Sequence, residues 1–414
     1  MKLGKTFACS ALLALLWSTA TAKEIPTAKP ADVGMSAEKL ARADEAVHAL
    51  VKENRLAGGV VMVARRGKIA HFQSYGLMDI ATKKPFRKDA IVRIYSMSKS
   101  ITSAAALILS DEGKLKLDAA VSEYLPELKD SKVAGGVAPK REMTVRDLMR
   151  HTSGLIYGFT GSSEVAKSYR RADVLNLNSS LSEMVVKLGK IPLAFAPGSD
   201  WQYGMSTDVL GRVVEAVAKV PFEEFLQNRI FEPLDMKDTG FFLPSGQLDR
   251  FATNYTSLGN GQLTLRDAPA TSQYLKKPGL SSGGGGLVST ARDYMRFLMM
   301  VANSGQLHGT RLLSEEAVKL MTTNQLPKGI ECIKFGTQIR HGVGFSLAFS
   351  VRFKQTKWDP QGRIGEYGWG GAASTHYWVS PQDDLIVVTL EQTMPYSFLT
   401  EFAVKGLIYD AIEK

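Results

Sequence analysis

The sequence predicts an α/β protein: an antiparallel β-sheet built from both chain ends, flanked by helices, with a mostly helical lobe. Two hairpin patterns carry this prediction. Apolar runs at 60–64 and 69–75 flank a turn-like Arg-Arg-Gly-Lys segment, and runs at 375–379 and 385–390 flank a polar turn containing Pro381. Because a lone hairpin is marginal in water, we expect both hairpins to share one sheet.

The middle of the chain is mostly helical in pattern. Helices are predicted at 96–112, 206–218 and 290–303, and a last one at 399–412 covers the sheet. Gly113 is a plausible stop for the first helix, and Ser206 to Asp208 are predicted to cap the second. The expected α/β body comprises residues 23–106, 156–196 and 269–414, and the expected helical lobe comprises 107–155 and 197–268.

The N-terminus predicts a secretion signal over residues 1–22. Lys2 and Lys5 make a basic start, an apolar core runs over 7–17, and Ala20-Thr21-Ala22 is a small-residue cleavage site. The core is too short for a permanent membrane span, so no stable membrane insertion is expected after its removal. The mature domain, 23–414, is therefore expected in the periplasm or secreted.

Composition narrows the function classes. The net charge of +10 falls to +8 without the two signal lysines, and no basic run interleaved with aromatics appears, which argues against nucleic-acid binding. The mature chain keeps only Cys332, so it forms no internal disulfide. Without a Cys/His cluster or a His-Glu-x-x-His motif, no metal site and no cofactor are expected. The sequence leaves the oligomeric state open.

Ser96-Met97-Ser98-Lys99 is the strongest chemical motif. It opens a strongly apolar helix, and residues three apart share a helix face, which places Lys99 beside the Ser96 hydroxyl. A serine becomes a nucleophile when a base removes its proton. A lysine can act as that base only where burial and neighbouring groups lower its pKa, and the buried helix would supply the burial.

Two further segments offer partners for Ser96. Tyr203 precedes the helix predicted at 206–218 and is free to point into a cleft. Trp369-Gly370-Gly371-Ala372 precedes the strand at 375, where paired glycines allow close approach of a ligand to the backbone. The N–H groups of Ala372 and Ser96 could stabilise an oxyanion.

Three other features of the sequence could have a structural or functional role. Gly279-Leu280-Ser281-Ser282-Gly283 fits Gly-x-Ser-x-Gly but lacks the preceding strand, and completing it with Asp359 and His376 is unsupported. His151 lies where a helix end meets a glycine turn, and we expect a scaffold residue that donates to backbone carbonyls. The glycines at 283–286 predict a loop where backbone approaches something closely.

Taken together, these segments resemble the serine β-lactamase-like family, which holds class C β-lactamases, DD-peptidases and family VIII carboxylesterases. IYSMSKS resembles its nucleophile motif, LMRHTSGL its His-Thr-Ser-Gly-Leu segment and PGSDWQYGMSTDVLG its tyrosine motif; EPLDMKDTGF and SGGGGLVSTARDY also match family stretches. The resemblance covers nearly the whole mature chain and implies the fold, a Ser96 nucleophile and a catalytic Tyr203.

Two departures place the chain closest to the carboxylesterase branch. Met205 stands where β-lactamases usually have Asn, and Trp369 stands where they carry the cation of Lys-Thr-Gly or His-Thr-Gly. The resemblance therefore implies hydrolysis of small-molecule esters with short acyl chains through an acyl-enzyme. Lys99 or Tyr203 is the base. The alternatives are a β-lactamase acting on lactams, a D-alanyl-D-alanine peptidase, an acyl-transferring relative, and a non-catalytic penicillin-binding-like scaffold.

Overall fold

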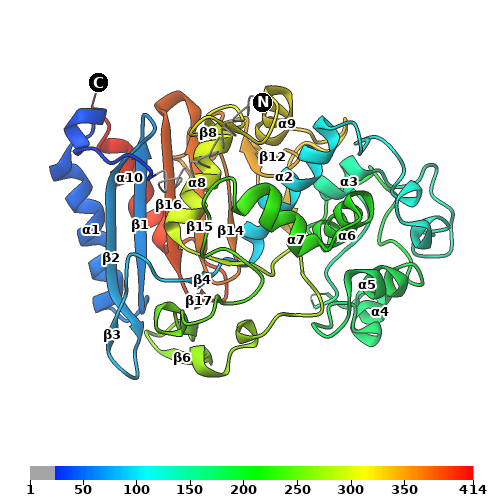
Figure 1. Ribbon diagram of the computed structural model, residues 1–414, viewed down its shortest axis with the longest axis horizontal. Coiled ribbons are helices and arrows are strands. Elements are labelled where there is room, and N and C mark those ends of the chain that lie inside the picture. Colours follow the sequence, from blue (N-terminus) through cyan, green and yellow to red (C-terminus); the bar gives the residue numbers. More distant parts are fainter. Residues whose placement is uncertain (1–23, 160, 414) are drawn as a thin grey trace, which may run out of the picture.

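The computed structural model, which describes residues 24–159 and 161–413, is built around an eight-stranded antiparallel sheet (Figure 1). The strand order is β12-β13-β14-β15-β16-β1-β2-β3. Their bounds are β1 Gly58–Arg65, β2 Lys68–Asp79, β3 Lys84–Pro85, β12 Val343–Phe345, β13 Ser350–Arg352, β14 Tyr367–Gly371, β15 Thr375–Ser380 and β16 Leu385–Glu391. The predicted secretion signal lies outside the described residues.

The two predicted hairpins pair with each other through β1 and β16. Met62 lies opposite Val388 and Val60 opposite Leu390 in an antiparallel register. Every residue of β1 and β16 is buried, because layers of helices cover both faces of the sheet. The expectation that the two chain ends share one antiparallel sheet is confirmed.

Helices α1 (Ala37–Lys52) and α10 (Leu399–Asp410) cover one face of the sheet, at the left of Figure 1. Val47 from α1 and Val404 from α10 belong to one buried cluster with Val61, Val387 and Trp378 of the sheet. The last predicted helix therefore packs on the sheet as expected.

Helices α2 (Ser98–Asp111) and α8 (Ala291–Ala302) lie on the opposite face. Every residue of α2 from Ser98 to Leu109 is buried. Gly113, with φ +71°, follows its end in the left-handed region, as predicted. This buried helix fixes the position of Lys99 in its first turn and of Ser96 immediately before it.

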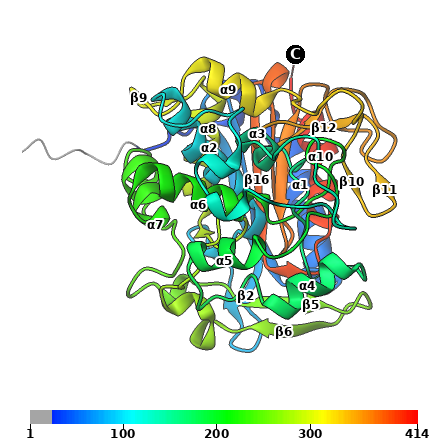
Figure 2. The ribbon, with the colours of Figure 1, turned by 90° about the vertical axis from the view of Figure 1, so that its right-hand side faces the viewer.

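A helical lobe lies beside the sheet, at the right of Figure 1 and towards the viewer in Figure 2. It contains α3 Val145–Met149, α4 Glu164–Ala172, α5 Leu181–Leu188, α6 Ser206–Ala218 and α7 Phe222–Leu226. The expected boundaries need correction. Helix α5 packs against α6 because its apolar face needs a partner, so much of 156–196 belongs to the lobe.

The last part of the segment 197–268, which was expected in the helical lobe, lies elsewhere. Strands β5 (Asn254–Ser257) and β6 (Leu263–Asp267) form a small sheet with β17 (Thr393–Met394), which follows the main sheet. This segment therefore belongs with the α/β body. The remaining elements are α9 Glu315–Thr322, β4 Val92–Arg93, β7 Val288–Ser289, β8 Gln306–Leu307, β9 Thr310–Arg311, β10 Lys334–Phe335 and β11 Gln338–Ile339.

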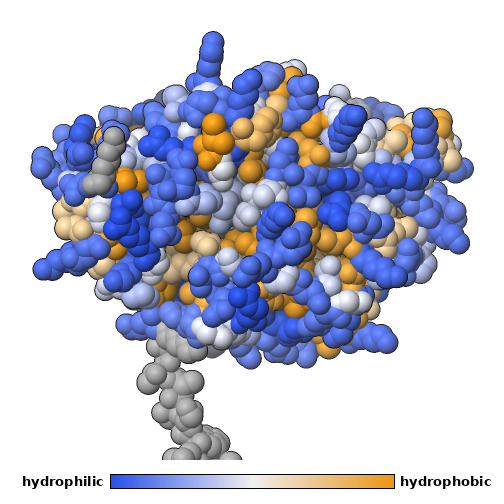
Figure 3. Space-filling model, turned by 90° about the horizontal axis from the view of Figure 1, so that it is seen from above, coloured by the Kyte–Doolittle hydropathy of each residue, from blue (hydrophilic) through white to orange (hydrophobic). Residues whose placement is uncertain are grey.

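The face seen from above in Figure 3 is covered mostly by hydrophilic side chains, with small groups of hydrophobic ones between them. Among the described helices, none is long and apolar enough to cross a membrane.

The lobe segment that leads to His151 is held by Asp147, whose side chain is fully buried. Its carboxylate accepts hydrogen bonds from Arg141, from Arg150 and from Thr152 Oγ1. Burial alone raises the pKa of Asp147, but the bonds from Arg141, the Thr144 N–H and Arg150 outweigh it and lower the pKa to about 2.

We predict that Asp147→Asn lowers the free energy of unfolding by about 2 kcal/mol at pH 7, the equivalent of that pKa shift. Because the pKa is lower in the folded state, the stabilisation is present above pH ~4 and is lost as the pH falls towards ~2. Urea unfolding of both proteins between pH 7 and pH 2.5 measures the difference.

Asp118→Asn is the matched control. Asp118 also accepts two hydrogen bonds from an arginine, Arg146, but its side chain is 74% exposed. Exposed ion pairs contribute little, so its loss should stay below about 1 kcal/mol. Equal losses for the two variants would contradict the assigned role of Asp147.

Candidate active site

Ser96 and Lys99 meet at the start of α2. Ser96 is the middle residue of a 3-10 helix, Tyr95–Met97, that leads directly into α2. Lys99 Nζ lies 3.4 Å from Ser96 Oγ. Tyr95, immediately before Ser96, has φ +42°, an unfavourable conformation for a non-glycine residue that surrounding structure must hold in place. The predicted one-turn spacing therefore brings the two side chains together.

Lys99 is only 3% exposed and is surrounded by oxygen atoms. Its Nζ donates to Tyr157 Oη at 2.9 Å and to the carbonyl oxygen of Gly284, and it lies 4.7 Å from the centre of the Tyr203 ring. Burial lowers the pKa of Lys99, but the electrostatic effects of Tyr157, Tyr203 and Asp208 outweigh burial and raise it above its usual value. Lys99 is therefore an ammonium in the resting site. Burial does supply desolvation, but the pKa is not lowered, so the condition for Lys99 to act as the base is not met in this resting site.

The sequence analysis did not identify Tyr157. It lies two residues after the last residue of the His-Thr-Ser-Gly-Leu segment, and its hydroxyl oxygen accepts a hydrogen bond from Lys99. Burial raises the pKa of Tyr157, and the nearby Lys99 charge offsets this only in part. Tyr157 therefore faces Lys99 as a neutral phenol. Its position next to a family-typical segment was the one available signal.

Asp208 holds the glycine loop against Lys99. It lies in the first turn of α6, is 1% exposed, and accepts hydrogen bonds from Ser282 Oγ and from the Gly284 N–H at 3.0 Å. A Cβ on Gly284 would lie 2.3 Å from Asp208 Oδ2, so only glycine fits. The close backbone approach predicted at 283–286 is therefore present, between Gly284 and both Asp208 and Lys99.

The capping prediction for α6 is wrong. Met205 occupies the N-cap position without a side-chain cap. Asp208 binds the glycine loop instead, and Ser206 Oγ hydrogen-bonds Ser153 Oγ at 2.8 Å. Burial raises the pKa of Asp208, partly offset by the Lys99 charge and the bond from Ser282.

Tyr203 lies in the loop before α6, as predicted, and points at the site. Its hydroxyl oxygen accepts a hydrogen bond from Trp369 Nε1 at 3.3 Å, and the two rings lie 5.3 Å apart. An indole N–H donor stabilises negative charge on the oxygen that accepts it. Tyr203 therefore lies between Lys99, over its ring, and Trp369, which donates to its hydroxyl.

Trp369, Gly370 and Gly371 are the last residues of strand β14 and precede strand β15, which begins at Thr375. A Cβ on Gly371 would lie 2.3 Å from the Ile94 carbonyl oxygen, so the strand end packs directly on the backbone leading to Ser96. Ala372 follows this strand end. The Ser96 N–H lies in the first turn of its helix, where no intrahelical acceptor is available. The geometry is consistent with the predicted oxyanion-binding pair.

His151 is packed within an aromatic cluster. Its ring lies 4.9 Å from Tyr203, 5.3 Å from Phe345 and 6.0 Å from Trp201. Neither ring nitrogen has a hydrogen-bond partner among the described residues, so the expected bond to a backbone carbonyl is absent. Burial and the Lys99 charge hold the pKa of His151 well below its usual value, so the ring is neutral.

The alternative catalytic arrangement, Ser281 with Asp359 and His376, is not formed. Ser281 lies in an irregular loop without a preceding strand, and its neighbour Ser282 is engaged by Asp208. Asp359 binds Arg352 and, at 3.0 Å, Lys405, and it makes no hydrogen bond to His376. Burial lowers the pKa of His376 to about 3. In the described part of the chain, no three His, Cys, Asp or Glu side chains are grouped as metal ligands.

Comparisons with known proteins identify the family of this chain. A family model described as Beta-lactamase matches residues 43–403. Esterase EstB of Burkholderia gladioli is 34% identical over 302 residues, which cover 69% of this chain and 75% of EstB.

Solved structures give the same result. EstCE1, described as a hydrolase with promiscuous acyltransferase activity, matches with a TM-score of 0.78 and 26% identity over 90% of this chain and 99% of its own. The unliganded selenomethionyl simvastatin synthase LovD of Aspergillus terreus shares the fold, with a TM-score of 0.76, 23% identity, and coverage of 90% and 98%.

The chain therefore belongs to the beta-lactamase family, in its serine β-lactamase-like group that includes esterases. The fold and the esterase relatives establish the class of enzyme, a serine hydrolase of the acyl-transfer type.

We predict that Ser96→Ala abolishes acyl-enzyme formation, while Ser281→Ala leaves it intact. Ser96 has the Lys99 contact and the helix-start geometry, and Ser281 has neither. Intact-mass measurement after incubation with a p-nitrophenyl ester detects the acyl adduct. An adduct that persists in Ser96→Ala would reverse the assignment.

Proposed function

We propose that this chain is a secreted or periplasmic carboxylesterase that cleaves short-chain esters through an acyl-enzyme on Ser96. The observation that carries the proposal is the replacement of a cation by Trp369, whose indole N–H binds Tyr203 beside the Ser96–Lys99 pair. Crowding by aromatic side chains around Tyr203, including Tyr157, Phe335 and Trp369, favours short acyl groups.

The proposed reaction uses Tyr203 as the proton acceptor. Lys99 is an ammonium, which has no free electron pair, so it favours negative charge on nearby oxygens instead of taking the proton itself. In the proposed resting state the Lys99 ammonium holds Tyr203 as a phenolate. The phenolate oxygen takes the Ser96 Oγ–H proton while Oγ bonds to the ester carbonyl carbon. The tetrahedral intermediate then expels the alcohol, which takes the proton from Tyr203. Water repeats the cycle and releases the acid.

The N–H groups of Ser96 and Ala372 are proposed to bind the oxyanion of that intermediate. Gly371 supports this because its contact with the Ile94 carbonyl presses the end of β14 against the Ser96 segment. Removing one such donor typically slows an enzyme by about 10²- to 10³-fold. No cofactor enters the proposed reaction.

Two positions favour esters over lactams. Lys-Thr-Gly-type motifs place a cation where a lactam carboxylate binds, and Trp369 has no charge to offer there. Met205 is completely buried at the start of α6 and presents no amide to a substrate. A neutral ester needs neither group. The match to EstCE1 supports acyl transfer to an alcohol as a secondary reaction of the same acyl-enzyme.

The test compares kcat/KM for p-nitrophenyl butyrate, a chromogenic cephalosporin and a D-Ala-D-Ala peptide. We expect the ester to be hydrolysed with the highest value. A kcat/KM for the cephalosporin equal to or above that for the ester would contradict the esterase assignment and favour the β-lactamase alternative. Ser96→Ala serves as the background control for all three substrates.

We predict that Lys99 and Tyr203 act as one unit. Lys99→Met and Tyr203→Phe should each reduce kcat by about 10²- to 10⁴-fold, the range for general acid–base groups. The double variant should lose far less than the product, because each residue works through the other. Single-turnover acylation rates for the four proteins measure this coupling, and strictly multiplicative losses would show independent action.

A further inference from the structure

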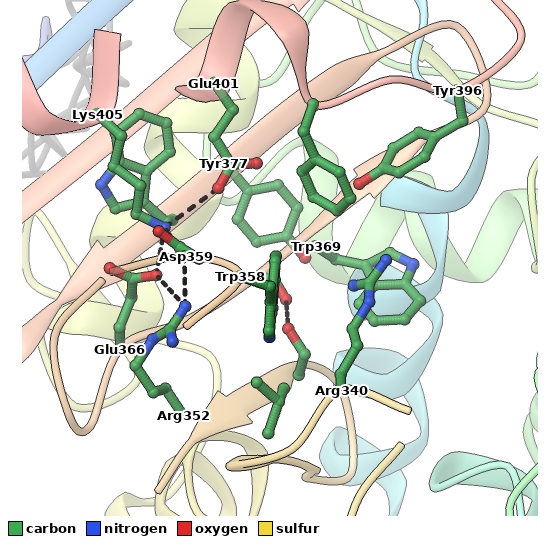
Figure 4. Close-up of a pocket in the computed structure, with 15 residues that line it drawn as sticks. Arg340, Arg352, Trp358, Asp359, Glu366, Trp369, Tyr377, Tyr396, Glu401 and Lys405 are labelled. Carbon is green, nitrogen blue, oxygen red and sulfur yellow. Dashed lines mark hydrogen bonds and ion pairs between the residues drawn. The ribbon is translucent and has the colours of Figure 1, made fainter. Parts of the chain in front are cut away.

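Arg340 is a cation held by aromatic rings close to the active site. It lies between β11 and β12, and its guanidinium carbon is 4.5 Å from the Phe335 ring centre, 5.0 Å from Phe398 and 5.2 Å from Trp358. Figure 4 shows Arg340 beside Trp358 and Trp369. Among the described residues, no carboxylate lies within 4 Å of it. Stacking uses the faces of a guanidinium and leaves the N–H groups along its edges available.

The cavity beside Arg340 has its own charges, and they are already paired. Arg340 and Trp369 line this narrow cavity of about 50 Å³ together with Asp359, Glu366 and Glu401. Lys405 Nζ binds all three carboxylates, at 3.0, 2.6 and 3.1 Å respectively.

Tyr396 and Glu401 favour the charged form of Arg340 electrostatically, and Arg340 also donates a hydrogen bond to Tyr396. Burial nevertheless dominates and lowers the pKa of the guanidinium, which stays charged. The positive charge of Arg340 therefore has no carboxylate partner of its own, because Asp359, Glu366 and Glu401 bind Lys405.

Arg340 is connected to the catalytic residues by shared neighbours. Phe335, which stacks on Arg340, also lies 5.8 Å from the Tyr203 ring and 6.0 Å from Trp369. Tyr396, another residue of the cavity wall, packs over Gly370 so closely that a Cβ there would lie 2.9 Å from its hydroxyl. The cavity that Arg340 lines is also lined by Trp369, which donates to Tyr203, so this cavity borders the aromatic wall of the site.

We propose that Arg340 recognises a carboxylate on the substrate, so that the preferred substrates are esters that also carry a free acid. The inference rests on the proposed esterase function and specifies its substrate class. Trp369 stands where the β-lactamase motif has a cation, and Arg340 supplies a positive charge from the segment between β11 and β12. A planar guanidinium binds a carboxylate through two parallel N–H donors. Of its five N–H donors, Arg340 uses one toward Tyr396, which leaves others for such a bond.

Two matched substrate pairs test the proposal and locate the acid. Mono-p-nitrophenyl adipate and its methyl ester differ by a carboxylate on the acyl side. 4-Acetoxybenzoate and methyl 4-acetoxybenzoate differ by a carboxylate on the alcohol side. For each pair, the ratio of kcat/KM for the acid to that for the methyl ester cancels any loss of folded enzyme.

We expect Arg340→Gln to lower this ratio by about 10- to 100-fold in one pair, the usual effect of losing a charged hydrogen bond. Arg340→Lys keeps a cation without the fork and should give an intermediate ratio. Arg363→Gln is the control, because Arg363 also stacks on a ring, that of Tyr409 at 4.4 Å, but is 40% exposed and outside the cavity.

The outcomes separate the two proposals. An unchanged ratio in both pairs for Arg340→Gln, or an equal fall for Arg363→Gln, overturns the role of Arg340 and leaves the esterase function standing. If the wild-type protein hydrolyses none of the four esters, the esterase proposal itself fails. A fall confined to the Arg340 variants and to one pair supports the inference and identifies the side that carries the acid.

Discussion

The burial of one ammonium group, that of Lys99, is the constraint on which the rest of the site depends. The ammonium is almost fully removed from water, and no carboxylate of the described chain lies within ion-pair distance of it. A buried charge is costly unless hydrogen-bond acceptors replace its water. The acceptors are Gly284, Tyr157 and Ser96, and each comes from a different segment. Satisfying one charge therefore forces three segments to meet.

The large sheet fixes the remaining side of this arrangement. Strand β14 reaches the site only because the C-terminal hairpin pairs with β1 through β16. Its end packs on the backbone at Ile94 without any side chain between, since Gly371 carries none. A larger residue at 371 would push the strand away from Ser96. The N- and C-terminal parts of the chain thus meet at the nucleophile.

Local pattern was sufficient to predict the scaffold and the Ser96–Lys99 pair. Apolar periodicity gave α6, α8 and α10 to within about two residues, and the one-turn spacing of Ser96 and Lys99 depends on the helix alone. Tyr203 and Trp369 approach from distant segments and were found through their motifs, but three other residues were not assigned their roles. Tyr157, Asp208 and Arg340 show no distinctive local pattern, because their roles depend on which segment the folded chain places opposite them.

The same reason explains the wrong predictions. Asp208 was expected to cap its own helix, a local interaction, but a buried carboxylate gains more from two donors on the glycine loop. The sequence left the choice of base between Lys99 and Tyr203 open, because burial alone would disfavour the charge on Lys99. The oxygens packed around it reverse that effect, and they come from segments whose proximity the sequence does not reveal.

The positive charges of Lys99 and Arg340 explain why the Trp369 indole can stand where β-lactamases carry a cation. Lys99 keeps a positive charge beneath the reacting atoms, and Arg340 holds a second one behind the aromatic layer. Oriented positive groups in a site that excludes water stabilise the negative charge that develops during acyl transfer. A third cation at Trp369 would add repulsion between like charges and would have to be desolvated. The indole avoids both costs and still donates a hydrogen bond to Tyr203, so the site keeps its electrostatic bias while its wall becomes apolar.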